Sequence, residues 1–147
     1  LGEVSFDEKG DLVRRLDPTR YVITTYTNDD YGKRIGQQVS LPDDPDLRAA
    51  LASQEAKLLA QLRVAGNNQQ QRETVLHDLL VFYTSQSLEF DKAASLQFLI
   101  TNRDQLYSLK LTLACVCKTY AERNKNLEAL IQEFPEKKAF TTGLMVK

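Results

Sequence analysis

The sequence predicts a mainly α-helical protein, with an irregular body resembling a four-helix bundle and an extended N-terminal arm that carries one or two short strands. Apolar side chains recur at helical spacing in the part of the chain that follows Pro42. Residues 1–41 lack that spacing, and Pro42 separates the two parts. We therefore expect two regions, an extended interaction arm at residues 1–41 and a helical domain at residues 42–147.

Strand signals in the arm are short. Val4 and Phe6 alternate with polar neighbours, and residues 21–27 are dense in β-branched and aromatic side chains. Residues 8–11 and 28–32 have turn composition. An isolated hairpin is marginal in water, so the arm needs cover from the helices or from another chain.

The first expected helix has a clear start and stop. Asp44 suits the N-cap, Pro45 suits the first helical position, and Gly66 is a typical residue just past a helix end. An apolar stripe between these signals consists of Leu47, Ala50, Leu51, Leu58, Leu62 and Ala65.

Three more helices are expected beyond Gly66. The second runs from about Gln70 to Leu88, and the third starts at Lys92 behind a capping Asp91. The fourth and longest runs from about Arg103 to Phe134, where Pro135 ends it. Residues 121–126 are polar all round, which allows a break there. Short polar linkers favour antiparallel neighbours in a bundle.

The overall charge gives no reason to expect nucleic acid or anionic membrane as a partner. The formal net charge is -1, so no overall basic field exists. Residues 1–46 hold 10 acids and 6 bases (net -4), and residues 47–147 hold 10 acids and 13 bases (net +3). A solvated surface with chance clustering explains this division, and an acidic arm that meets a basic partner is the alternative. No apolar run approaches the roughly 18 residues that span a bilayer.

The two ends of the sequence suggest a longer protein. The chain starts at Leu1, its only methionine is Met145, and it stops in an apolar stretch, so we expect further residues upstream and downstream. No signal peptide and no Asn-x-Ser/Thr acceptor is visible. With two closely spaced cysteines, these features favour a reducing, cytoplasmic compartment.

Chemistry-bearing residues are scattered, and we expect no catalytic, cofactor-binding or metal-binding residues and therefore no enzyme. His77 is the only histidine; a surface histidine paired with Glu73 is favoured over a general base. Cys115 and Cys117 are two residues apart, which on a helix turns them about 200° from one another. Such a pair does not share a zinc ion or a disulfide, so small apolar side chains in a buried helix is the favoured interpretation. The acidic pairs near Asp29 and Asp43 lack the glycine and final glutamate of a calcium loop.

Aromatic and branched side chains of the arm are the expected partner-binding residues. Tyrosine is favoured at interfaces because its ring is buried while its hydroxyl stays wet. Packing of the same side chains onto the helical body is equally compatible with the sequence. The expected partner-binding set is Phe6, Tyr21, Ile23, Tyr26 and Tyr31.

The stretch from Leu76 to Leu109 resembles a known family. It contains the run Asp78-Leu79-Leu80-Val81-Phe82-Tyr83, followed by Phe90, Ser95 and Phe98. In this it is similar to the helical segment of small cilia- and flagella-associated coiled-coil-domain proteins of the axonemal central apparatus. The resemblance implies a structural subunit of an axonemal complex, with no enzymatic residues to transfer.

These features together predict a non-enzymatic structural or adaptor subunit of a large cytoskeletal assembly. Its expected partners are other protein subunits, with no nucleic acid, membrane or small-molecule substrate, and its expected place is the cytoplasm, in the axoneme of a cilium or flagellum. Two alternatives remain open: a regulatory module that recruits a calmodulin-like protein through an amphipathic helix, and a non-catalytic subunit of another multiprotein complex.

Overall fold

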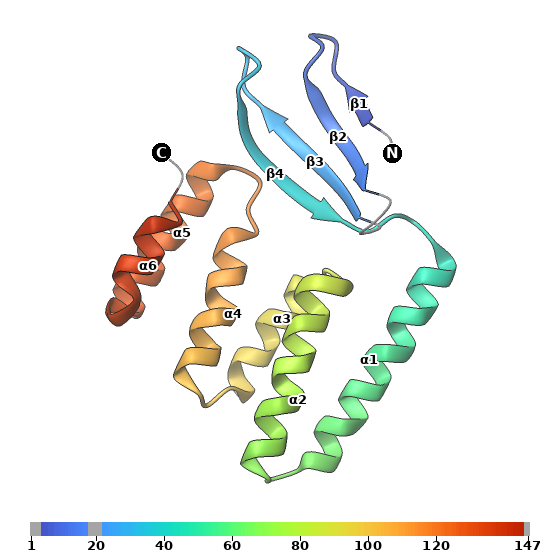
Figure 1. The fold of residues 1–147 in the computed structure, drawn as a ribbon, viewed down its shortest axis with the longest axis vertical. Helices are drawn as coiled ribbons and strands as arrows, with labels where there is room; N and C mark the ends of the chain where they lie inside the picture. Colours follow the sequence, from blue (N-terminus) through green and yellow to red (C-terminus); the bar gives the residue numbers. More distant parts are fainter. Residues whose placement is uncertain (1–3, 18–21, 146–147) are drawn as a thin grey trace. The chain divides into compact units, whose positions relative to one another are not determined.

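The computed structural model describes residues 4–17 and 22–145, and the chain forms two compact units (Figure 1). The first unit, here called the sheet unit, combines Leu1–Pro42 with Ala114–Lys147. The second, the helical unit, is the continuous segment Asp43–Leu113. The two ends of the sequence therefore belong to one unit.

The predicted fold class, a mainly α-helical bundle with an arm of one or two short strands, is wrong. The described residues form six α-helices and a four-stranded antiparallel sheet, with 62% of the chain helical and 15% in strands. The two missed strands carry Arg14 and Arg15 in one case and the run 36–38, Gly-Gln-Gln, in the other. Neither stretch alternates apolar and polar side chains, so the pattern that predicts strands is absent from these two.

The sheet is a simple meander. Strands β1 (Val4–Phe6), β2 (Leu12–Asp17), β3 (Val22–Asn28) and β4 (Arg34–Ser40) pair antiparallel in chain order. The predicted strand at residues 21–27 is confirmed as β3, a central strand. Hairpin connections keep consecutive strands adjacent, and β1 and β4 become the two edges.

The hairpins β1–β2 and β3–β4 have turns of the same construction. Asp7 Oδ1 accepts hydrogen bonds of 2.9 Å from the backbone N–H groups two and four residues later, and Asp29 Oδ1 does the same in the second hairpin. Each turn then uses a glycine with a positive φ, 86° at Gly10 and 82° at Gly32, which a residue with a Cβ rarely adopts. The two predicted turns are confirmed.

The C-terminal helices complete the sheet unit. Helix α5 (Tyr120–Glu133) contacts β4, and a short 3-10 turn, η3 (Pro135–Lys137), leads into α6 (Lys138–Gly143), which contacts α5. The buried side chains of these helices are Leu127, Leu130, Phe134 and Thr141. Gly36 in β4 lies directly against the backbone before α5, because a Cβ added to it would meet Lys118 O at 1.8 Å.

The helical unit begins as predicted. Helix α1 spans Pro45–Ala65, and Asp44 caps it by accepting hydrogen bonds from the backbone N–H groups of Asp46 and Leu47. Gly66 ends it, with its own N–H donated to Leu62 O at 3.4 Å. The cap residues fix these bounds because they supply partners for the unpaired backbone groups of the helix ends.

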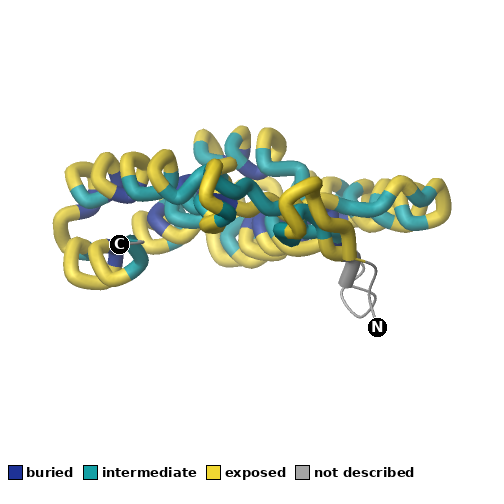
Figure 2. The backbone as a smooth tube through the Cα atoms, turned by 90° about the horizontal axis from the view of Figure 1, so that it is seen from above, coloured by how far each residue is buried: buried dark blue, intermediate teal, exposed yellow. Residues whose placement is uncertain are grey.

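Later helices differ from the predicted ones at their ends. Helix α2 (Gln69–Val81) passes into a π-helical turn, η1 (Phe82–Gln86), instead of continuing to Leu88. Helix α3 (Phe90–Ser95) passes into a 3-10 turn, η2 (Leu96–Leu99). Buried residues recur along the helices in Figure 2, and the helical unit has one core cluster. Its members are Leu58, Val75, Leu76, Leu79, Leu80, Phe82, Tyr83, Ala93, Leu96, Ile100 and Leu109.

The predicted fourth helix is two helices. Helix α4 (Arg103–Cys115) ends before a loop, and α5 starts after Thr119, whose hydroxyl accepts a hydrogen bond from Glu122 N at 3.3 Å. The polar stretch 121–126, which allowed a break, lies inside α5, and the break falls before it.

Candidate functional site

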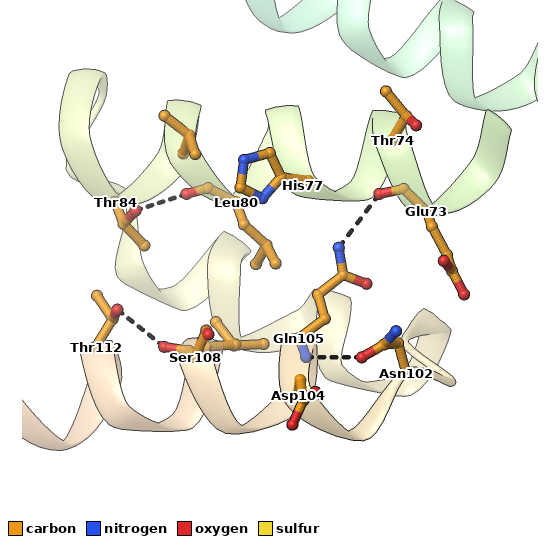
Figure 3. Close-up of a pocket in the computed structure, with 12 residues that line it drawn as sticks. Glu73, Thr74, His77, Leu80, Thr84, Asn102, Asp104, Gln105, Ser108 and Thr112 are labelled. Atoms are coloured by element: carbon orange, nitrogen blue, oxygen red, sulfur yellow. Dashed lines mark hydrogen bonds between the residues drawn. The ribbon is translucent and has the colours of Figure 1, made fainter. Parts of the chain in front are cut away.

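A groove runs between α2 and α4 of the helical unit and has a volume of about 520 Å³ (Figure 3). Its floor is apolar, with Leu80 and Leu109 buried. The full lining consists of Glu73, Thr74, His77, Leu80, Val81, Thr84, Asn102, Asp104, Gln105, Ser108, Leu109 and Thr112. The size lies in the range of small-molecule sites, so its polar groups decide what it can do.

Polar groups of the groove are mostly used within the fold. The hydroxyls of Thr74, Thr84 and Thr112 each donate to the carbonyl four residues earlier in their own helix. Gln105 Nε2 donates to Glu73 O at 3.2 Å and so ties α4 to α2, as the dashed line in Figure 3 shows. These hydrogen bonds stabilise the helices and the packing between them. Much of the polar lining of the groove therefore has a structural role that requires no ligand.

His77 lies exposed on the groove side of α2. The expected pairing with Glu73 is not formed, because Glu73 Oε1 accepts a hydrogen bond from Gln69 Nε2 at 3.0 Å. Within the described part of the chain no hydrogen bond or ion pair is seen for the imidazole of His77. The histidine is therefore not set up by a second residue as a general base, which needs an orienting partner and a positioned proton source.

A charged network links α1 to the segment after α2. Tyr83 Oη donates to Glu55 Oε2 at 2.7 Å, and Lys92 Nζ lies 3.0 Å from the same carboxylate and 2.8 Å from Glu89. The hydrogen bond from Tyr83, followed by the one from Lys92, lowers the pKa of Glu55 below its ordinary value. Burial, together with the bond to Glu55, raises the pKa of Tyr83, and the bonds to Glu89 and Glu55 raise the pKa of Lys92. Each shift favours the protonation state already present at neutral pH, so the network stabilises contacts and does not prepare an acid or base.

We expected both cysteines in a buried helix, and the structure places them differently. Cys115 is the last residue of α4 and Cys117 lies in the following loop, and both thiols are free and half-buried. Asn126 Nδ2 donates to Cys117 Sγ at 3.0 Å, while burial raises the pKa of that thiol. Among the described residues, no three His, Cys, Asp or Glu side chains are grouped so as to hold a metal ion.

The expected partner-binding residues are spread over the sheet unit. Phe6 is 60% exposed on β1, and Tyr31 is 96% exposed in the β3–β4 turn. Ile23 and Tyr26 are half-buried, and because they are three residues apart on β3 they lie on opposite faces of the sheet. Tyr21 lies outside the described residues. The four described residues of the set therefore do not form a single surface.

The strand register divides the side chains of the sheet into two rows, one on each face. The register places Val4, Arg15, Thr24 and Val39 side by side across the four strands on one face. Ser5, Arg14, Thr25 and Gln38 form the corresponding row on the other face. Gly36 shares this second face with Gln38, so the backbone at Lys118 approaches the sheet from there.

Strand β1 is an open edge. Its only strand neighbour among the described residues is β2, and Val4, Ser5 and Phe6 are all exposed. Val4 is 50% exposed and Phe6 60%, and alternation places both on the same face of the strand. An edge strand offers a row of backbone N–H and C=O groups to another chain. Sequence reasoning selected Phe6 but missed Val4, although their alternation marks both.

Three acidic residues of the first 46 positions have structural roles. Asp7 and Asp29 bind backbone N–H groups in the two turns, and Asp44 caps α1. Lys9 Nζ donates to Asp30 O at 2.9 Å and joins the two hairpin turns.

No helix in the described ranges is long and apolar enough to cross a bilayer. Comparison of the chain with models of known protein families, with curated proteins and with solved structures finds no match.

Proposed function

We propose that the chain is a non-enzymatic adaptor that binds another protein through the β1 edge of its sheet. The observation that carries this proposal is the combination of an open strand edge with two exposed apolar side chains, Val4 and Phe6. Native proteins usually protect such edges with charge, proline or a covering element. The three side chains of β1 are Val, Ser and Phe, so the strand itself carries neither charge nor proline.

Strand addition is the binding mode that fits this edge. An extended segment placed beside β1 would form backbone hydrogen bonds with it, and its alternate side chains would cover Val4 and Phe6. Burial of apolar area contributes about 25 cal/mol per Å². The turn that follows β1 is held rigidly by Asp7 and Gly10, so the edge keeps its extended form before a partner arrives.

The assembly that we propose is a large cytoskeletal one, the axoneme of a cilium or flagellum. The support for it is the resemblance of residues 76–109 to small axonemal coiled-coil-domain proteins. In this proposal the helical unit acts as a rigid body and its groove has no catalytic role. A non-catalytic place in another multiprotein complex would use the same edge.

Replacing Phe6 with serine tests the proposal. Phe6→Ser should reduce capture of crosslinked partner proteins by about tenfold, because it removes one of two apolar side chains from the edge. Since Phe6 is already 60% exposed, the melting temperature should stay within about 1 °C. Crosslinking, affinity purification and quantitative mass spectrometry measure the capture.

The matched control is Phe140→Ser. Phe140 is exposed to the same extent, 61%, but lies on α6. Capture of the same partners should be unchanged in this variant. If Phe140→Ser reduces capture as much as Phe6→Ser does, the β1 edge is not the binding surface.

A further inference from the structure

The charged side chains that the structure describes in the strands are all basic, while the side chain of Asp17 in β2 lies outside the described ones. In the sheet, the charged side chains that the structure describes are Arg14, Arg15 and Arg34. Arg34 is stacked on the ring of Tyr26, with 3.7 Å from its Cζ to the ring centroid. In the described part of the chain, no ion pair joins Arg14 or Arg15 to a carboxylate.

The register puts two of these arginines directly behind the open edge. Arg14 is opposite Ser5 and Arg15 is opposite Val4. Strands lie about 4.8 Å apart, so a segment added beside β1 would lie roughly 10 Å from the backbone of β2. Ser5 has a small side chain, so a long side chain of the added strand can extend past it to Arg14. Val4 and Phe6 lie on the other face of the strand.

We propose that the β1 edge selects an extended partner segment that alternates apolar, acidic and apolar side chains. The acidic side chain lies opposite Ser5 and reaches over it to the guanidinium of Arg14. The two apolar side chains lie opposite Val4 and Phe6, where they cover exposed apolar surface. This inference rests on the proposed function, since it specifies the partner of the same edge.

Charge decides between an acidic and a basic segment. A lysine opposite Ser5 would meet Arg14 with like charge, because both lie on the same face of the sheet. A carboxylate there gains a guanidinium that has no other carboxylate among the described side chains. A second copy of this chain fits less well. Antiparallel self-pairing centred on Ser5 would place serine opposite serine and leave Arg14 without a counter-charge.

Synthetic peptides test the proposal on the full chain. Three fluorescein-labelled peptides share the sequence Thr-Thr-Val-X-Val-Thr-Thr, with X as glutamate, as lysine, or as glutamate with every backbone amide N-methylated. Fluorescence anisotropy measures the dissociation constants. The glutamate peptide should bind about fivefold more tightly than the lysine peptide, which corresponds to one partly exposed ion pair. The N-methylated peptide should not bind, because it cannot pair with an edge strand.

Variants locate the charge preference. Arg14→Gln should remove the fivefold preference for glutamate, whereas Arg63→Gln, the same change on exposed α1, should leave it intact. Equal binding of the glutamate and lysine peptides by the unmodified chain would overturn the acidic preference and leave the edge itself as the binding site. Failure of all three peptides, or equal binding of the N-methylated one, would overturn strand addition and with it the proposed function. Dimers in sedimentation velocity that Phe6→Ser dissociates would show that a second copy, and not an acidic segment, occupies the edge.

Discussion

Gly36→Ala should destabilise the sheet unit by about 3 kcal/mol, which lowers its melting temperature by roughly 10 °C. An added Cβ at this position would lie 1.8 Å from Lys118 O and 2.7 Å from Lys118 C. Both are backbone atoms, so no side-chain rotation relieves the clash. Either β4 or the loop before α5 has to move, and the buried contact between the sheet and the C-terminal helices is lost. Thermal and urea denaturation followed by circular dichroism measure the change.

Gly143→Ala is the matched control for this prediction. No atom lies within 4 Å of a Cβ at position 143, and the residue ends α6. Alanine has the higher helix propensity, so this variant should be neutral or slightly stabilised, by less than about 1 kcal/mol. Equal stability of Gly36→Ala and Gly143→Ala would show that the C-terminal segment is not packed against β4.

Phe134→Ala should cost about 3–5 kcal/mol, the range for removing a fully buried phenylalanine ring. The side chain of Phe134 is 0% exposed, and its backbone N–H still donates to Leu130 O at 2.8 Å at the end of α5. Alanine leaves a cavity at this buried position, which lies between α5 and the segment that leads into α6. Urea denaturation measures the free energy of unfolding.

Phe140→Ala provides the comparison within the same unit. With 61% of its surface exposed, this ring contributes little, and its loss should change stability by less than about 0.5 kcal/mol. A Phe134→Ala variant as stable as Phe140→Ala would mean that α5 and α6 do not share a core.

Helix α1 could be predicted almost to the residue because its boundary signals act locally. Asp44, Pro45 and Gly66 each satisfy or terminate backbone hydrogen bonding within a few residues of themselves. The break between α4 and α5 also has a local signal in the sequence, one that the predicted continuous helix did not use. Thr119 followed by Glu122 is the spacing of a capping box, and it marks the start of α5 more strongly than the polar stretch after it.

Strands β2 and β4 could not be predicted in the same way. Each of these strands is held in the sheet by pairing with residues elsewhere in the chain. Both strands carry polar or charged side chains on exposed faces. Local propensity for strand formation depends on packing against those neighbours. For the same reason the sequence marked Phe6 as exposed and apolar but did not reveal that β1 is an edge.

Only part of the candidate binding site at the β1 edge could be predicted from the sequence. Alternation predicts that Val4 and Phe6 share a face, and the structure confirms the strand. That Ser5 stands opposite Arg14 follows from a register that shifts by one residue between Ser5 and Phe6. No pattern along the chain encodes such a shift, because it depends on how two strands fit together.

Backbone hydrogen exchange of β1 tests the central claim most directly. The partner captured in the crosslinking experiment is added to the full chain, and amide exchange rates are compared with those of the free chain. Our account predicts that those amides of β1 that point away from β2, which alternate along the strand, become protected at least tenfold on binding, because a new strand occupies the open edge. Unchanged exchange in β1 together with protection along the α2–α4 groove would contradict it.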